Sequence, residues 1–260
     1  MIRLVFLLRR RSELSLSDFQ HYWREKHGPL VASLATTLGI EKYVQVHALD
    51  EPMNGAMAEA RGGMEPPYDG VAELWFASEE ALAEALGSEE GEGAASALLE
   101  DEARFIDLAR SPLWLAVELP QVNPAGEMLV ATPRSSLLKL YFPLRMRPEL
   151  GLEDGQRYWR THHGPIIRSQ APAQGIQRYQ QVHRHASLLE AALREARGTI
   201  VDAYDGHAEV WFDRGAPRTG PEAQQANARA IEDESRFIDF SRSAMWVGKE
   251  LVFVDRTGWH

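Results

Sequence analysis

The chain has 260 residues, of which 44% are hydrophobic, and its formal net charge at pH 7 is −10. Nucleic acids and anionic membranes require local positive charge, so this balance argues against both as partners. The absence of cysteine excludes disulfides, thiolate metal sites and cysteine nucleophiles. The longest apolar run, residues 4–8, is too short for a membrane span and precedes its arginines, unlike a secretory signal, so we expect a cytoplasmic protein.

The sequence is a tandem duplication. Its clearest element is Tyr-Trp-Arg-x-x-His-Gly-Pro at 22–29, which returns 136 residues later at 158–165. The same displacement relates three further motifs: Tyr-x-Gln-Val-His at 43–47 and 179–183, Ala-Arg-Gly at 60–62 and 196–198, and Tyr-Asp-Gly at 68–70 and 204–206. It becomes 132 for Glu-Asp-Glu-x-Arg-Phe-Ile-Asp at 100–107 and 232–239. We therefore predict two domains, 1–120 and 137–260, joined by a linker at 121–136.

Each half opens with a short apolar run, 4–8 or 138–144, which predicts a strand buried on both faces. A helix follows in the first half, for which Ser17 is the expected N-cap and Gln20 its capping-box partner. We expect this helix to cover a sheet with one apolar face. That face carries Phe19, Trp23, Leu30 and Leu34.

Pro29 and Pro165 interrupt the long helix of each half. A proline inside a helix removes a backbone donor and strains the preceding turn, so the helix should kink or restart there. His27 and His163 lie just before this break and beside the apolar face. We expect both imidazoles to be held rigidly and partly desolvated.

The second strand, 42–47, alternates between a polar and a valine-rich face. A turn at 68–70 leads into a third strand, 71–76, and a fourth is expected at 113–118. Between them, the glutamate- and glycine-rich segment 87–93 is predicted to be a flexible surface loop.

The resulting order is β-α-β-β-α-β, twice, which defines an α+β fold of two ferredoxin-like repeats. A four-stranded sheet with helices on one face leaves the other face uncovered. Two similar halves can cover one another, so we predict a pseudo-dimeric α+β barrel within one chain. Association into a further homo-oligomer remains open.

These motifs resemble the EthD family of the dimeric α+β-barrel superfamily. The resemblance rests on Trp-x-x-x-His-Gly-Pro after a strand, Tyr-x-Gln-x-His on the second strand, Tyr-Asp-Gly before the third and Asp-Glu-x-x-Phe before the fourth. It covers 3–118 and again 139–250. Typical members have one such domain and pair as homodimers, whereas this chain resembles both partners fused.

The resemblance implies a broad range of functions. Similar proteins include some needed for ether degradation, and cofactor-free cyclases, dehydratases, decarboxylases and a muconolactone isomerase. In the isomerase-like pattern, the helix histidine and polar residues of the second strand act on the substrate. The matching positions here are His27, Tyr43 and His47 in the first half, and His163, Tyr179 and His183 in the second.

These histidines have two interpretations. As an acid–base pair, the helix and strand histidines of one half would shuttle a proton next to a carbonyl, because imidazole titrates near neutral pH. As structural groups, the helix histidine would bond a backbone group freed by the proline, and the strand histidine would be a satisfied polar residue inside the barrel. The sequence leaves open whether the cavity lies between the sheet and its helices or inside the barrel. The sheet-facing position of His27 favours the first, if His27 is to meet His47.

The remaining polar candidates are assigned to substrate binding: Gln45, Gln181, Glu73, Glu209, Trp75 and Trp211. The glutamates could instead steer a histidine or cap a helix, and Glu102 is interpreted as part of a solvated, salt-bridged helix face. His183, His185 and Glu209 could together ligate a metal, but a first-half counterpart of His185 is missing because Leu49 stands there. We therefore predict neither a metal nor a cofactor.

Two hypotheses from different classes follow. The first is a cofactor-independent acid–base enzyme, a lyase or isomerase, acting on a hydrophobic, oxygenated small molecule. The second is a non-catalytic binding or accessory protein that holds such a ligand. Haem is a weaker third idea, raised only by other members of the superfamily.

Overall fold

The computed structural model describes residues 1–123 and 129–258, and within them eight strands close into a barrel. The strand order around the barrel is β1-β3-β2-β8-β5-β7-β6-β4. The bounds are β1 Ile2–Leu8, β2 Ile40–Ala48, β3 Gly70–Phe76, β4 Leu113–Val122, β5 Leu137–Leu144, β6 Ile176–Arg184, β7 Gly206–Asp213 and β8 Trp246–Asp255. The predicted pairing of two ferredoxin-like sheets is confirmed.

Two antiparallel seams join the halves. β2 pairs with β8, so that Gln45 lies opposite Leu251, and β4 pairs with β6, so that Leu119 lies opposite Gln181. Each half therefore supplies its second and fourth strands to the other. Closure leaves the barrel without an open sheet edge, which is the feature that makes isolated sheets prone to aggregation.

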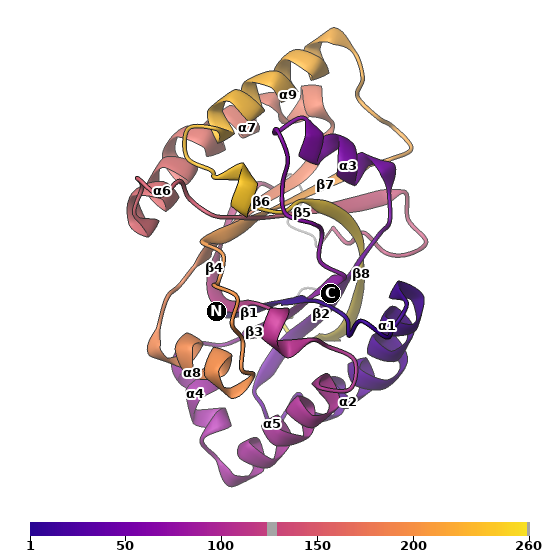
Figure 1. The fold of residues 1–260 in the computed structure, drawn as a ribbon, viewed down its shortest axis with the longest axis vertical. Helices are drawn as coiled ribbons and strands as arrows, with labels where there is room; N and C mark the ends of the chain where they lie inside the picture. The colour runs from indigo at the N-terminus through magenta and orange to yellow at the C-terminus, as the bar shows by residue number, and fades with distance from the viewer. Residues whose placement is uncertain (124–128, 259–260) are drawn as a thin grey trace.

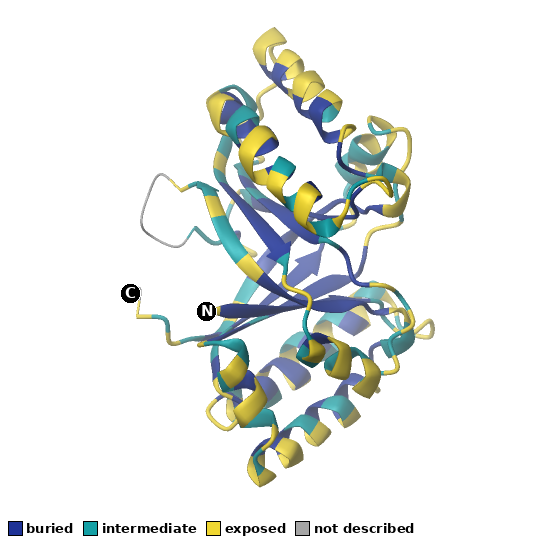
Figure 2. Cartoon of the chain, turned by 90° about the vertical axis from the view of Figure 1, so that its left-hand side faces the viewer, coloured by how far each residue is buried: buried dark blue, intermediate teal, exposed yellow. Residues whose placement is uncertain are grey.

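Helices cover the barrel on two opposite sides and expose their outer faces (Figures 1 and 2). In the first half they are α1 Leu16–Tyr22, η1 Trp23–His27, α2 Gly28–Leu34, α3 Pro52–Glu59, α4 Glu79–Leu86, α5 Glu89–Glu102 and η2 Leu108–Arg110. In the second they are α6 Leu152–Tyr158, η3 Trp159–His163, α7 Gly164–Gln174, α8 Leu188–Ala196, α9 Pro221–Glu234 and η4 Phe240–Arg242. Among these residues, none of the helices is long and apolar enough to cross a membrane.

Two helices lie against the opposite half. In Figure 1, α3 of the first half lies beside α7 and α9, and α8 of the second half lies beside α4 and α5. Leu189 and Leu193 of α8 accordingly pack on the first-half core, and Met57 of α3 packs on the second-half core. The halves thus exchange a covering helix as well as strand contacts.

The cap of the first helix differs from the prediction. Ser15, not Ser17, is the N-cap: its Oγ accepts a hydrogen bond from the backbone N–H of Asp18 at 3.1 Å. The Asp18 carboxylate in turn accepts a hydrogen bond from Ser15 Oγ at 2.7 Å. In the second half Gly151 caps the corresponding helix without a side-chain bond.

A π-helical turn explains how the long helix passes its proline. At η1 the backbone N–H of Gly28 bonds to the carbonyl of Trp23, five residues back, and the helix restarts as α2 with Pro29 in its first turn. Such a turn contains one extra residue, so it rotates the following helix about its axis. The buried face therefore continues through Val31 and Ala35, whereas the predicted Leu30 and Leu34 are only partly buried.

The segment 87–93 is not a loop. Only Gly87 and Ser88 separate α4 from α5, and Ser88 caps α5 by accepting a hydrogen bond from the N–H of Gly91 at 3.0 Å. A side chain at Gly91 would collide with the carbonyl of Ala85, so glycine there permits the tight corner between the helices. The glutamates of this segment occupy the first turn, where the helix dipole favours negative charge.

The segment between the two halves partly lies outside the described residues. β4 continues to Val122, two residues into the predicted linker 121–136, and β5 begins at Leu137. Residues 124–128 of that linker are not described.

Candidate functional site

Each half contains a cavity between its side of the barrel and its helices, as expected from the position of His27. The first-half cavity has a volume of about 490 Å³ and the second-half cavity about 480 Å³. Both have mainly apolar walls with a few polar side chains, the composition typical of small-molecule sites. His27 and Tyr43 line the first, and their counterparts His163 and Tyr179 line the second.

An aspartate orients the helix histidine. Nδ1 of His27, in η1, lies 2.8 Å from Oδ2 of Asp101 on α5, and the hydroxyl of Tyr22 donates to Oδ1 of Asp101 at 2.6 Å. A carboxylate can only accept, so the neutral ring carries its proton on Nδ1 and keeps a lone pair on Nε2. The ring is 5% exposed and lines the cavity, and among the described residues Nε2 has no hydrogen-bonding partner. The hydrogen bond from His27 holds the pKa of Asp101 below its usual value.

The second half repeats this arrangement. Nδ1 of His163 lies 2.8 Å from Oδ2 of Asp233, and Tyr158 donates to Oδ1 of Asp233 at 2.8 Å. Burial alone would raise the pKa of Asp233, but the hydrogen bonds from His163 and Tyr158 outweigh it and hold that pKa below its usual value. The two aspartates were not among the predicted site residues. Their signal in the sequence was the repeated Glu-Asp-Glu motif.

The strand polar residues form a directional hydrogen-bond chain on the helix-facing side of β2. Gln45 Nε2 donates to the carbonyl of Trp23 at 2.9 Å, and this fixes the orientation of the amide because a carbonyl can only accept. The same Nε2 donates to the Tyr43 hydroxyl at 2.9 Å, and Oε1 of Gln45 lies 2.8 Å from Nε2 of His47. The proton of His47 is therefore on Nε2. Every donor of Gln45 and its carbonyl oxygen are used inside the protein.

This chain leaves one donor free at the cavity wall. The Tyr43 hydroxyl accepts from Gln45 Nε2 and from Trp23 Nε1, the latter at 3.2 Å, so both of its lone pairs are engaged. Within the described residues its own O–H has no acceptor, and the side chain lines the cavity. Burial raises the pKa of Tyr43, which keeps the hydroxyl protonated. Tyr179 has the same environment, with donors at 3.0 Å from both Trp159 and Gln181.

The strand histidines do not reach the cavities. The ring of His47 stacks on Trp23 with centroids 4.6 Å apart and does not line the first-half cavity, and His183 stacks on Trp159 at the same distance. Burial lowers the pKa of His47 to about 3 and that of His183 to about 4, so both are neutral at pH 7. The histidines of each half are thus not a facing pair, because the tryptophan ring covers the strand histidine. Both rings pack under the helices rather than inside the barrel.

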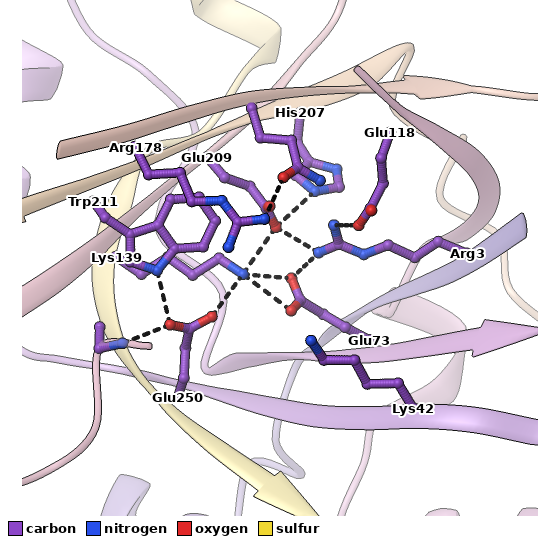
Figure 3. Close-up of polar contacts among 12 residues, drawn as sticks. Arg3, Lys42, Glu73, Glu118, Lys139, Arg178, His207, Glu209, Trp211 and Glu250 are labelled. Carbon is purple, nitrogen blue, oxygen red and sulfur yellow. Dashed lines mark hydrogen bonds and ion pairs between the residues drawn. The ribbon is translucent and has the colours of Figure 1, made fainter. Parts of the chain in front are cut away.

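The other predicted binding residues divide between two places. Gln45 and Gln181 belong to the hydrogen-bond chains just described, whereas Glu73, Glu209, Trp75 and Trp211 point into the barrel. There Arg3 and Lys139 lie between the carboxylates of Glu73 and Glu209 (Figure 3). A cavity of about 310 Å³ inside the barrel is lined by these glutamates and tryptophans and by Lys139.

The ion cluster in the barrel pairs two cations, Arg3 and Lys139, with four carboxylates, those of Glu73, Glu118, Glu209 and Glu250. Burial raises the pKa of Glu73 to about 8, even though Arg3 and Lys139 oppose the shift. Burial acts the same way on Glu209, but the two cations outweigh it and hold that pKa well below its usual value. Glu73, His207 and Glu209 could in principle offer three atoms to a metal ion, but Arg3 and Lys139 already occupy those carboxylates.

The metal set considered from the sequence does not assemble. His183 packs under the helices, His185 bonds Glu79 at 2.8 Å on the surface, and Glu209 lies inside the barrel. The strand on which His183 lies separates it from the barrel interior.

An ion pair between the halves lies in the wall of each cavity. Arg197, at the end of α8, binds Glu102 of α5 through two hydrogen bonds of 2.9 Å, and Arg61, after α3, binds Glu234 of α9 at 2.8 and 3.2 Å. All four residues line the cavities. Glu102 is 5% exposed, so its assignment to a solvated helix face was wrong. The repeated Ala-Arg-Gly motif thus holds the exchanged helix in place.

The fold defines a dimeric α+β barrel in which both partners are one chain. The EthD domain model matches residues 11–109 and 147–241, and the chain therefore belongs to the EthD family. Among curated protein sequences none matches. A putative monooxygenase from Fusobacterium nucleatum has a similar structure, with a TM-score of 0.51, 5% identity and coverage of 96% of this chain and 93% of that one. An EthD family protein from Bacillus halodurans is 18% identical, covers 46% of this chain and 99% of its own, and has a TM-score of 0.33.

Proposed function

We propose that the protein is an acid–base enzyme, of the cyclase, isomerase, dehydratase or decarboxylase type, acting on a hydrophobic, oxygenated small molecule. The observation that carries the proposal is the pairing of an open imidazole nitrogen with an open tyrosine hydroxyl in one apolar cavity. His27 and Tyr43 form this pair in the first half, and His163 and Tyr179 form it in the second.

These groups suit proton abstraction next to a carbonyl. Nε2 of the histidine takes the proton, and the electron pair of the broken C–H bond forms a double bond to the carbonyl carbon. The negative charge moves to the carbonyl oxygen, to which the tyrosine donates its free hydroxyl. The aspartate stabilises the imidazolium until the proton returns to another carbon or leaves with a departing group.

The neighbouring residues keep these two groups ready. The aspartate favours the histidine tautomer with an open Nε2, and Trp23 and Gln45 engage both lone pairs of the tyrosine hydroxyl, which leaves its proton for an acceptor in the cavity. Because mainly apolar walls lower the local dielectric constant, a hydrogen bond to the developing charge is stronger there than in solution.

Hydrogen–deuterium exchange at carbon tests the proposal without knowledge of the substrate. The purified protein is incubated in D₂O with a panel of ketones that carry an aromatic ring, among them 2-tetralone, and loss of the α-proton signals is followed by NMR. We expect exchange above the buffer rate, and its loss by about 100-fold or more in the double variant His27→Ala/His163→Ala. The matched control is His162→Ala, because this exposed neighbour of His163 does not line the cavity.

The same samples separate the alternatives. An accessory protein would bind members of the panel without exchange and would be unaffected by either histidine substitution. Exchange that persists in the double variant contradicts the assignment of the histidines. An absorbance spectrum of the purified protein tests the haem alternative.

A further inference from the structure

The two cavities share their polar pair but differ at one end. In the first-half cavity, this wall includes Leu38, Leu82 and Leu86 of α4, and Glu92, Ala95 and Ser96 of α5, so it carries a carboxylate but no cation. In the second half, the chain is four residues shorter here, so that a loop at 214–220 replaces α4. The corresponding wall is therefore built from different residues.

Three polar side chains occupy this end of the second-half cavity. Gln174 stands where the first half has Leu38, Asn227 stands where it has Ala95, and Arg218 comes from the loop that replaces α4. Gln174 Nε2 donates to Asn227 Oδ1 at 2.8 Å, whereas Gln174 Oε1 is buried and has no partner among the described residues. The end thus offers an unused acceptor beside a cation.

Arg218 is an exposed residue of this loop, and it lines the cavity with its side chain lying over Gly175. A side chain on Gly175 would come within 2.8 Å of Cγ of Arg218, and Gly175 has a left-handed φ of +71° that favours glycine. None of the described carboxylates forms an ion pair with Arg218. The exposed guanidinium therefore offers its donors to solvent or to a ligand at this end of the cavity, in a protein whose net charge of −10 otherwise repels anions.

We propose that the second-half cavity binds hydrophobic molecules carrying a carboxylate, with Arg218 as the residue that recognises it, whereas the first-half cavity binds the neutral counterparts. This inference rests on the proposed function for the site to which it applies, and it makes the two halves an acid-selective and a neutral-selective version of one site. A guanidinium recognises a carboxylate through two parallel N–H···O bonds. The Gln174 carbonyl accepts from a ligand hydroxyl at the same end.

Binding of 2-naphthoate and 2-naphthamide tests the inference, because the two probes have the same shape and differ in charge. Calorimetry is carried out on Ala72→Phe, which fills the first-half cavity, and on Ala208→Phe, which fills the second, since these alanines are equivalent wall residues. With the first cavity filled, we expect naphthoate to bind about tenfold more tightly than the amide, and Arg218→Ala to abolish the preference. With the second cavity filled, the preference should be absent.

Arg214→Ala is the matched control, because this arginine lies on the same loop but binds Glu51 on the surface. If either phenylalanine variant fails to fold, the same two probes are titrated into the otherwise unchanged protein and its Arg218→Ala and Arg214→Ala variants. A naphthoate affinity that Arg218→Ala leaves unchanged overturns the inference. Loss of the proposed function would appear separately, as carbon exchange insensitive to the histidines, because the binding test requires no turnover.

Discussion

The helix-facing cavities and the barrel interior both bury polar side chains. His27 is 5% exposed and Glu73 is fully buried. In the cavities, neighbouring groups fix the polar side chains but leave one histidine nitrogen and one tyrosine hydroxyl open. In the barrel, Arg3 and Lys139 bind the carboxylates of Glu73 and Glu209, while Arg3 Nε, His207 Nδ1 and the Tyr141 hydroxyl have no partner among the described residues. Unused hydrogen-bonding capacity thus occurs in both regions, but only in the helix-facing cavities does it lie on mainly apolar walls, the composition typical of small-molecule sites.

The largest expected effect is on activity, and it comes from changing the two aspartates that bind the cavity histidines. Asp101→Asn/Asp233→Asn removes the charge that stabilises the imidazolium and allows the ring to adopt the wrong tautomer. We expect the carbon-exchange rate to fall by about 100-fold or more, measured by NMR in D₂O. Either single variant should show how much each half contributes.

Glu100→Gln is the control for this pair, since Glu100 is exposed on the same helix as Asp101. Exchange rates that do not change in the double aspartate variant would contradict the role given to the aspartates.

In the barrel, the expected effect is on stability instead. Lys139→Met leaves three carboxylates, Glu73, Glu209 and Glu250, with one cation fewer. Breaking a buried ion pair costs about 3–5 kcal/mol, so the free energy of unfolding in urea should fall by that amount. Lys139→Arg should restore most of it, because Arg3 holds the equivalent position in the first half. A large loss of exchange activity per folded molecule would show that the barrel belongs to the active site.

The third effect is smaller and depends on pH. Burial lowers the pKa of His207 to about 3, against about 6.5 in an unfolded chain, so below pH 6.5 the unfolded state binds a proton that the folded state does not. His207 thus reduces stability by about 2 kcal/mol between pH 7 and pH 5. His207→Val, which introduces the residue of the first half at Val71, should remove this loss.

The measurement is urea unfolding of the parent and the variant at both pH values. Glu73 acts with the opposite sign, because its raised pKa of about 8 favours the folded state as pH falls from 8 toward 4.5. Both proteins contain Glu73, so the difference between their changes in free energy of unfolding from pH 7 to pH 5 reports the contribution of His207. An identical pH dependence in both proteins would disprove the assignment.

The repeat made much of the fold predictable. Two copies of one motif order predicted two ferredoxin-like halves, and the alternation of 42–47 predicted that Tyr43, Gln45 and His47 share a face. On the long helix of the first half, the predicted buried face was correct for Phe19 and Trp23 but wrong for Leu30 and Leu34, which are only partly buried. A π-helical turn cannot be read from an ideal helical period, so the phase beyond it was missed.

The site was only partly predictable from sequence, for a related reason. The sequence by itself determined the duplicated framework, the histidines before the prolines and the polar stripe of each second strand, because these depend on spacing along the chain. Only the tertiary structure decided which groups meet: Asp101 with His27, Arg197 with Glu102, and Trp23 between His47 and the cavity. These contacts join residues far apart in the sequence, and helix packing on the barrel determines which of their hydrogen-bonding atoms remain free.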